Sequence, residues 1–237
     1  MINETEKIIS KNPNKVENPY NDISYILVDE FQDISFARYH LIKSLRKVNP
    51  SLKFYCVGDD WQSIYMFAGS RISIMQSFED YFGIAKTEFL EDTFRFPQSL
   101  VNIASDFIQK NKKQYKKTIK AISEKIDKPL KICNRYIDED GNDISLEKLL
   151  KRIQKQDPNS SVFVLGRYNF VKPDNFKLIQ SQFKNLKIEF KTIHKSKGLQ
   201  SDYVIILDVN KGKYGFPSEI TDDPLLGLVM QKKEIFP

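Results

Sequence analysis

The sequence predicts an α/β protein with parallel sheets, and three observations support this fold class. Short apolar, β-branched runs alternate with amphipathic segments along most of the 237 residues. Several of these runs are apolar throughout, which is typical of strands buried on both faces of a parallel sheet. The composition, with 41% hydrophobic and 29% charged residues, is sufficient for a substantial core. We therefore expect parallel sheets covered by helices on both faces.

The first part of the chain is expected to hold a loose leader, three strands and three helices. The polar residues 1–22 form the leader, and the apolar strands are expected at 23–28, 52–57 and 87–90. A helix begins after the capping residue Ser35, because Phe36, Tyr39, Ile42 and Leu45 recur at helical spacing. Further helices are expected at 72–82, ending at Gly83, and from Pro97 to Ile108.

The second part repeats the alternation. Strands are expected at 130–134, 162–165, 186–192 and 203–209, with helices at 145–156 and 175–183. The pattern restarts after a polar junction at 91–96, so we predict a domain of residues 23–92 and a second domain of residues 93–237.

Charge and composition restrict the function classes. A net charge of +6 favours a polyanion partner, chiefly nucleic acid, although a lysine-rich proteome gives the same value. The sequence contains no signal-peptide pattern and no apolar stretch of the roughly 20 residues that span a bilayer, which predicts a cytoplasmic protein without membrane contact. Cys56 and Cys133 are expected to pack in the core, with a disulfide or metal site as the alternative.

Acidic and amide side chains follow two of the predicted strands. Asp29 and Glu30 come directly after Val28, and Asp59 and Gln62 follow the next strand. Ligands bind beyond the carboxyl ends of parallel strands, where one carboxylate can hold Mg²⁺ and its neighbour can activate water. A glutamine amide there can contact a γ-phosphate. The alternative for the acidic pair is a solvated turn.

Aromatic and basic side chains follow these loops. Tyr65 and Phe67 could present ring faces to unpaired bases or could belong to the core. A lysine cluster could line one helical face, either solvated or in contact with a DNA backbone; it consists of Lys110, Lys112, Lys113, Lys116, Lys117 and Lys120.

The runs 28–33 (VDEFQD) and 58–65 (GDDWQSIY) resemble motifs II and III of superfamily 1 DNA helicases of the UvrD/Rep type. The resemblance implies two RecA-like (P-loop NTPase-type) domains, the first incomplete, that use ATP and Mg²⁺ to move 3′ to 5′ on single-stranded DNA. It assigns Asp29 to the metal, Glu30 to the catalytic base and Gln62 to the γ-phosphate. Tyr65 and Phe67 would contact the DNA strand.

Two positions are more similar to the helicase IV branch of this family than to UvrD itself. These are Trp61 and Ala68, the latter standing where the family motif has arginine. The short interval between the fourth and fifth motifs leaves no room for a large 2B insertion, which favours the same branch.

Two further runs resemble motifs IV and V of the family. In residues 93–96, Phe94 would stack on adenine and Arg95 would reach the γ-phosphate as a catalytic arginine. In residues 191–200, Thr192 and His194 would contact DNA, and Gln200 would bind the ribose where the family has glutamate. Within the same run, Lys197 and Gly198 would shape the loop, and residues 212–217 resemble the turn that follows motif V.

The sequence lacks GxxxxGK[ST], the loop that cradles phosphates, and the arginine-bearing VALTRA-like run of the family. We therefore expect a fragment of an ATP-dependent helicase or translocase that is inactive by itself. The alternatives are a non-catalytic remnant or split subunit that binds DNA or a partner, and the motor part of a helicase–nuclease.

Overall fold

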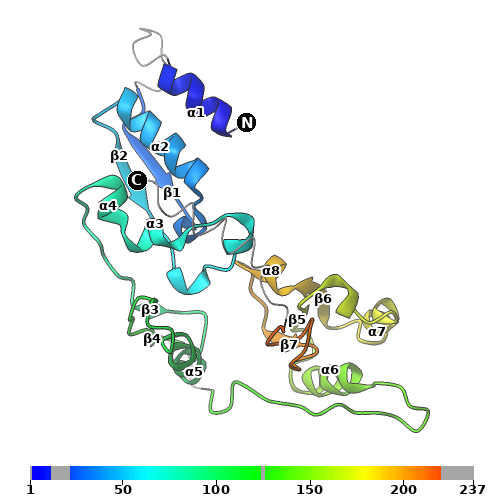
Figure 1. Cartoon of the computed structure of the whole chain (residues 1–237). Helices are drawn as coiled ribbons and strands as arrows, with labels where there is room; N and C mark the ends of the chain where they lie inside the picture. The colour runs from blue at the N-terminus through cyan, green and yellow to red at the C-terminus, as the bar shows by residue number, and fades with distance from the viewer. Residues whose placement is uncertain (1, 12–21, 124–125, 220–237) are drawn as a thin grey trace. The chain divides into compact units, whose positions relative to one another are not determined.

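The computed structural model describes residues 2–11, 22–123 and 126–219 (Figure 1). The chain forms two compact units, residues 1–131 and 132–237. The first unit contains α1 (Ile2–Lys11), β1 (Tyr25–Val28), α2 (Phe36–Val48), β2 (Lys53–Cys56), α3 (Ile72–Gln76), α4 (Phe78–Phe82), β3 (Asp92–Thr93), α5 (Gln98–Ile108) and β4 (Lys120–Ala121). The second contains α6 (Ser145–Gln156), β5 (Ser161–Gly166), α7 (Phe176–Gln182), β6 (Lys187–Thr192), α8 (Ile193–Ser196) and β7 (Tyr203–Ile206).

Every strand pairing in the sheets of the described residues is parallel, as predicted for an α/β protein. In the first unit β1 pairs with β2 and β3 pairs with β4, and in the second the strand order is β6–β5–β7. Parallel strands need long connections, and here helices supply them between β1 and β2 and between β5 and β6.

The core of the first unit lies on one face of the β1–β2 sheet. Side chains from α2, α3, α4 and the 3₁₀ helix η1 (Phe31–Asp33) pack there: Phe31, Ile34, Tyr39, Ile42, Ile74 and Phe82. On the opposite face Tyr25, Leu27 and Tyr55 are exposed. The prediction that this sheet is covered on both faces is therefore wrong for the described residues.

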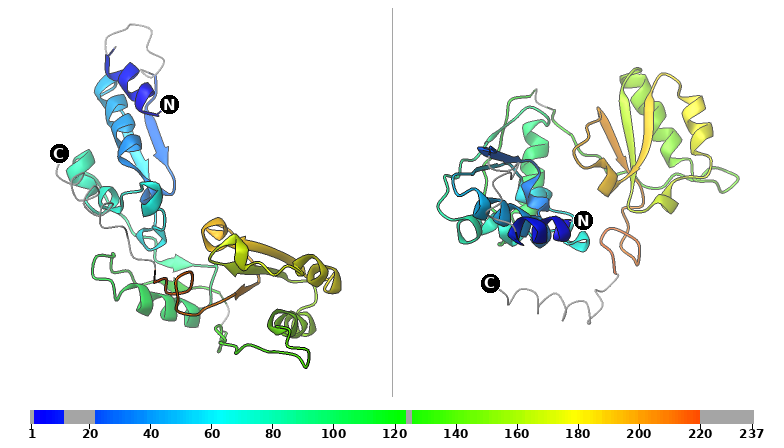
Figure 2. Two further views of the ribbon diagram at one scale, coloured as in Figure 1. Left: turned by 45° about the vertical axis from the view of Figure 1, so that its right-hand side comes forward. Right: turned by 90° about the horizontal axis from the view of Figure 1, so that it is seen from above.

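The beginning of α2 confirms the predicted cap, whereas the loose leader is corrected. The Ser35 hydroxyl accepts a hydrogen bond from the Arg38 N–H. Residues 2–11 form α1, which lies beside α2 (Figure 2). Ile9 is buried, and Ser44 on α2 donates a hydrogen bond to Glu6, because one face of this polar segment packs on its neighbour. Residues 12–21 of the expected leader lie outside the described part.

Several expected elements differ in the structure. Residues 87–90 form no strand, and Leu90 is exposed, because no strand in the described part of the chain pairs with them. The helix expected over 72–82 divides at Ser77 into α3 and α4, although it ends at Gly83 as predicted. The chain leaves helical structure after α5, so the lysines beyond residue 110 do not share a helical face.

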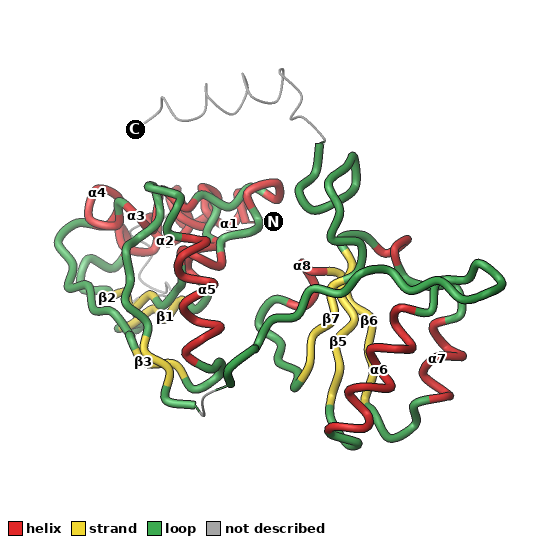
Figure 3. Tube along the Cα trace, turned by 90° about the horizontal axis from the view of Figure 1, so that it is seen from below, coloured by secondary structure: helices red, strands yellow, loops and turns green. Residues whose placement is uncertain are grey.

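The second unit follows its predicted pattern closely. Helices α6 and α7 pack on one face of the sheet (Figure 3), and α6 has the predicted bounds. Val204 and Ile206 on β7 are exposed, so the predicted cover of helices on both faces is also wrong for the described residues of this sheet. Its core consists of Leu146, Leu150, Val162, Val164, Phe176, Ile179, Phe183, Leu186, Ile188 and Ile205. The strand expected at 203–209 ends at Ile206. Residues 130–134 form no strand; they run across the junction of the two units, and Ile132 is exposed.

The units divide between Lys131 and Ile132, whereas the sequence boundary was placed near residue 92. Residues 92–123 belong to the first unit because backbone groups of this segment, such as the Tyr115 N–H, bind side chains of the loop after β2. The division into domains 23–92 and 93–237 stays a prediction about the family's modules.

The two cysteines lie in different environments, and both are free thiols. Cys56 packs against the core of the first unit, and burial raises the pKa of its thiol to about 11. Cys133 is exposed, so its predicted place in a core is wrong, because the strand expected around it does not form. Within the described residues, no helix has the length and apolar character to cross a membrane.

Leu150→Ala tests the core of the second unit, because Leu150 has no exposed surface. The substitution is expected to lower the free energy of unfolding by about 2–5 kcal/mol through lost burial and a residual cavity. Leu178→Ala is the matched control, since Leu178 lies on α7 with 58% of its surface exposed. Denaturant unfolding followed by circular dichroism measures both, and equal losses would contradict this core.

Candidate functional site

The loops after β1 and β2 lie side by side. The strands pair in register up to Val28 and Cys56. Backbone hydrogen bonds continue past the strand ends, from the Val57 N–H to the Val28 carbonyl and from the Phe31 N–H to the Val57 carbonyl, each at 2.8 Å. This geometry confirms that the acidic residues of both loops follow the carboxyl ends of neighbouring parallel strands, where ligands bind in such sheets.

Asp29 and Glu30 form a tight, constrained turn. Glu30 has a left-handed backbone conformation, with φ of 51°, and its N–H donates to Asp29 Oδ1 at 2.8 Å. A non-glycine residue in this region costs about 1–3 kcal/mol, so surrounding contacts must hold it there. A pocket of about 200 Å³ opens beside the turn and is lined by Val28, Asp29, Glu30, Phe31, Asp33, Ile34, Arg38 and Ile42.

Gln32 joins the two loops, a role that its sequence pattern does not predict. Its side chain is fully buried; Oε1 accepts the Asp59 N–H at 2.9 Å, and Nε2 donates to the Glu30 carboxylate. A backbone N–H can only donate and a carboxylate accepts, so this pair of partners fixes the orientation of the amide. A Cβ at Gly58 would lie 2.7 Å from Gln32 Oε1, which explains the glycine there.

Asp59 organises the loop after β2. Its Oδ1 accepts the Trp61 N–H at 3.1 Å and so caps the 3₁₀ helix η2 (Asp60–Gln62), while its Oδ2 accepts from Gln62 Nε2 at 2.8 Å. The structure thus connects two predicted site residues, Glu30 and Gln62, through Gln32 and Asp59. Gln62 is exposed, whereas Gln32 is buried.

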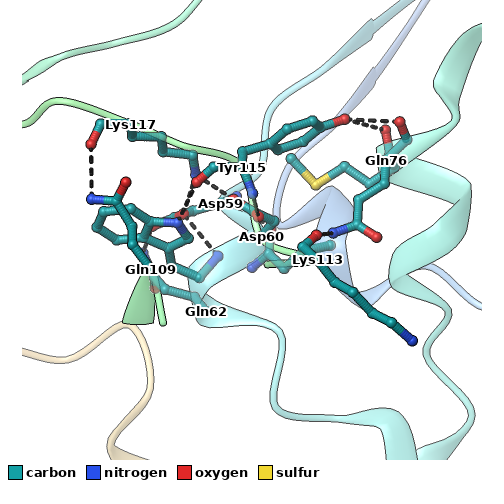
Figure 4. Close-up of polar contacts among 11 residues, drawn as sticks. Asp59, Asp60, Gln62, Gln76, Gln109, Lys113, Tyr115 and Lys117 are labelled. Atoms are coloured by element: carbon teal, nitrogen blue, oxygen red, sulfur yellow. Dashed lines mark hydrogen bonds and ion pairs between the residues drawn. The ribbon is translucent and has the colours of Figure 1, made fainter. Parts of the chain in front are cut away.

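Lys117 pairs with both carboxylates of this loop (Figure 4). Its Nζ lies 2.7 Å from Asp59 Oδ1 and 2.5 Å from Asp60 Oδ1, and the Asp60 side chain has no exposed surface. Only 15% of the Lys117 side chain is exposed. The expectation that the whole lysine cluster is a surface feature is therefore wrong for Lys117, since carboxylates distant in sequence compensate its burial.

The ion pairs shift the pKa values of both partners. Burial acts to raise the pKa of Asp59, but hydrogen bonds from Lys117 and Gln62 outweigh it and hold the pKa below its ordinary value. Burial acts to lower the pKa of Lys117, but hydrogen bonds to Asp59 and Asp60 and their charges raise it above the ordinary value. Asp59 and Lys117 are therefore both charged at neutral pH when the loop is folded in this way.

Tyr65 and Phe67 lie together just beyond this loop. Their ring centroids are 6.1 Å apart with an interplanar angle of 57°. Phe67 has 74% of its surface exposed, within the 3₁₀ helix η3 (Met66–Ala68). The alternative that Phe67 is a core residue is therefore excluded.

Phe94 and Arg95 follow β3, and both are exposed. The Arg95 N–H donates to Thr93 Oγ1 at 3.4 Å. In the part of the chain described here, these side chains are not among the hydrogen-bonded groups around Gln32, so the structure does not bring them together with Glu30.

The predicted DNA contacts of the second unit lie at the end of β6. Thr192 is buried and caps α8, with its hydroxyl accepting the Lys195 N–H at 3.4 Å. His194 lies in α8, and Gln200 is exposed in the loop leading to β7. Gly198 has φ of 76°, a conformation that favours glycine. The run thus forms the expected loop between two parallel strands.

An aromatic group that the sequence pattern did not predict follows β5. Tyr168 and Phe170 stack at 5.2 Å, and Tyr214 meets both rings edge-on. Arg167 donates to the Gly215 carbonyl at 3.0 Å and lies 5.4 Å from the centre of the Phe216 ring. The signal in the sequence was the closely spaced aromatic residues after β5.

Possible metal ligands in the first unit are carboxylates. Among the described residues no group of three or more His, Cys, Asp and Glu side chains could hold a metal. Asp29 and Glu30 offer two adjacent carboxylates at the pocket, and Mg²⁺ commonly uses one or two carboxylates together with substrate phosphates and water. The residues therefore fit a magnesium–nucleotide complex better than an ion held by protein alone.

Comparison with known proteins identifies the family of this chain. The model of the UvrD/REP helicase N-terminal domain matches residues 1–83. Over 213 residues, 90% of this chain, the sequence is 36% identical to DNA helicase IV of Escherichia coli (strain K12). It is 32% identical over 69% of its length to the putative ATP-dependent DNA helicase YjcD of Bacillus subtilis, and 30% identical over 71% to the ATP-dependent DNA helicase PcrA of Staphylococcus epidermidis.

The chain spans less than a third of each relative: 30% of the Escherichia coli protein, 21% of YjcD and 23% of PcrA. The family match includes both the Asp29–Glu30 turn and the loop from Asp59 to Gln62. Because the similarity to DNA helicase IV also extends over nine-tenths of the residues of this chain, this chain belongs to the UvrD/Rep family of helicases.

Proposed function

We propose that this chain supplies part of the motor of an ATP-dependent DNA helicase, one that couples ATP hydrolysis to 3′-to-5′ movement on single-stranded DNA. The observation that carries this proposal is the hydrogen-bonded connection from Glu30 through Gln32 and Asp59 to Gln62. It lies beyond two parallel strands, beside a pocket. In this proposal residues 23–92 form the C-terminal part of one RecA-like domain, and residues 93–237 form most of another.

The two carboxylates of the β1 loop have different roles in hydrolysis. Asp29 holds Mg²⁺, which when bound neutralises charge on the phosphates. Glu30 orients the attacking water and accepts its proton at the carboxylate, and Gln32 holds that carboxylate in place. Gln62 contacts the γ-phosphate, and its link to Asp59 carries the state of the nucleotide into the loop after β2.

The remaining predicted residues contact adenine, ribose or DNA. Phe94 stacks on adenine, Arg95 stabilises charge on the transferred phosphoryl group, and Gln200 binds the ribose. Tyr65 and Phe67 of the first unit contact DNA, and Thr192 and His194 are the proposed DNA contacts of the second unit. The exposure of Phe67 supports its contact with DNA, because a base can stack on an exposed ring.

Binding of DNA or a protein partner without catalysis is the second candidate function. One observation favours it: the exposed Phe67 ring can stack on a base without any hydrolysis. A motor part of a helicase–nuclease is compatible with the same residues.

The 237-residue chain is expected to release phosphate from ATP at the background rate, with or without single-stranded DNA, since its sequence has no phosphate-binding loop. The reference is a chimaera in which the chain replaces the similar stretch of Escherichia coli DNA helicase IV. DNA-stimulated hydrolysis by the chain alone at the rate of the chimaera would contradict this expectation.

Glu30→Gln in that chimaera is expected to slow ATP hydrolysis by about 10²- to 10⁴-fold while ATP binding is retained, because the amide cannot accept a proton. Glu88→Gln is the control, since Glu88 is an exposed carboxylate that pairs only with surface Lys86 in the described structure. Steady-state turnover and equilibrium nucleotide binding measure the two effects. Undiminished turnover in Glu30→Gln would exclude Glu30 as the base.

Tyr65→Ala and Phe67→Ala are each expected to weaken binding of single-stranded DNA by about 1–3 kcal/mol, the contribution of one base stacked on an aromatic ring. Fluorescence anisotropy with a labelled oligothymidylate measures the affinity of the 237-residue chain. Phe107→Ala is the matched control, because Phe107 on α5 is 74% exposed, as Phe67 is. An equal loss in all three variants would show that the two rings have no specific contact.

A further inference from the structure

The segment around Lys117 is fastened to the loop after β2 by its backbone as well as by its charge (Figure 4). The Tyr115 N–H donates to Asp60 Oδ2 at 2.7 Å, and the Tyr115 carbonyl accepts from the Trp61 indole at 3.0 Å. Gln109 donates to the Lys117 carbonyl at 3.2 Å. Lys117 thus has a fixed place beside the loop, although it is distant from it in sequence.

The opposite side of the segment is held by α3. The Tyr115 hydroxyl donates to the Gln76 carbonyl at 3.0 Å, and Gln76 Nε2 donates to the Lys113 carbonyl at 2.6 Å. An exposed lysine on a surface loop can bind solvent without such contacts to its neighbouring residues. The segment therefore presents the Lys117 ammonium group to two carboxylates in one defined geometry.

The two arms of this ion pair do different things. The contact with Asp60 compensates a fully buried charge, which is a structural role. The contact with Asp59 reaches a carboxylate that also accepts from Gln62: Lys117 and the Trp61 N–H share Oδ1, so Oδ2 is directed to Gln62 Nε2. Without the ammonium group, Asp59 would face Asp60 as an uncompensated like charge.

We propose that Lys117 is a positioning residue for Gln62, acting through Asp59. The ammonium group fixes the plane of the Asp59 carboxylate, and that plane sets where the Gln62 amide points. This role rests on the proposed function, in which Gln62 contacts the γ-phosphate. It makes the segment 109–117 part of the nucleotide-sensing loop rather than a surface connection.

The test uses the ¹⁵N-labelled 237-residue chain without nucleotide, and its readout is the side-chain amide signal of Gln62, assigned by its loss in Gln62→Glu. Lys117→Met is expected to move this signal from its wild-type position, and Lys117→Arg is expected to restore it. Lys116→Met is the matched control, because Lys116 is the exposed neighbour and the charge change is the same. The dispersion of the backbone amide signals in the same spectra reports whether the chain stays folded; Trp61 fluorescence would not, because Lys117 Nζ lies 5.3 Å from the centre of its ring.

Lys117→Met leaves the buried Asp60 without its cation, so this variant can unfold for structural reasons alone. If Lys117→Met unfolds, the double variant Asp60→Asn/Lys117→Met, which removes both buried charges, takes its place in the test. The proposal expects the Gln62 signal to be displaced in the folded double variant as well. A wild-type Gln62 signal in either folded variant would overturn it.

The outcome is independent of the hydrolysis experiments, because no nucleotide is present. If the Gln62 signal depends on Lys117 while Glu30→Gln retains full turnover, the positioning role stands and the proposed function falls. If Glu30→Gln stops turnover while the Gln62 signal is unchanged in the Lys117 variants, the proposed function stands and the positioning role is excluded.

Discussion

The in-register parallel pairing of β1 with β2 is the constraint on which the candidate site depends. It aligns Val28 with Cys56, and the backbone hydrogen bonds beyond the strands then bring the Asp29–Glu30 turn against Gly58. The same register directs Phe54 and Cys56 toward the core of the first unit. A shift by one residue would turn these side chains to the other face and separate the two loops, so core packing and site geometry are specified together.

Buried polar groups then restrict each loop to one conformation. Gln32 and Asp60 are fully buried, and such groups are costly unless their hydrogen bonds and charges are satisfied. Gln32 finds its partners across the two loops, and Asp60 finds Lys117 and the Tyr115 N–H. Any rearrangement that leaves these partners unpaired is penalised, which also offsets the strain at Glu30.

The sequence predicted what depends on local pattern and missed what depends on distant partners. The strand before Asp29, the Ser35 cap and helix α6 were predicted because periodicity and capping chemistry are local. Residues 87–90 have the composition of a strand, but no strand of the described residues pairs with them, so the strand predicted there was wrong. The ion pair of Lys117 could not be predicted from the sequence, because its partner Asp59 lies 58 residues earlier in the chain.

The site residues differ in how firmly their contacts hold them, and this difference favours Gln62 as the residue that changes its hydrogen bonds when a ligand binds. Gln32 and Asp60 are enclosed, and Glu30 is fixed by its backbone and by Gln32. Gln62 is exposed, and its amide is held through Asp59 Oδ2. A ligand that approaches these loops can exchange one solvent-accessible hydrogen bond at Gln62 at little cost, whereas it would have to break buried ones elsewhere. The loop after β1 is thus firmly held at Glu30, the proposed base, and the loop after β2 is adjustable at Gln62, the proposed phosphate contact.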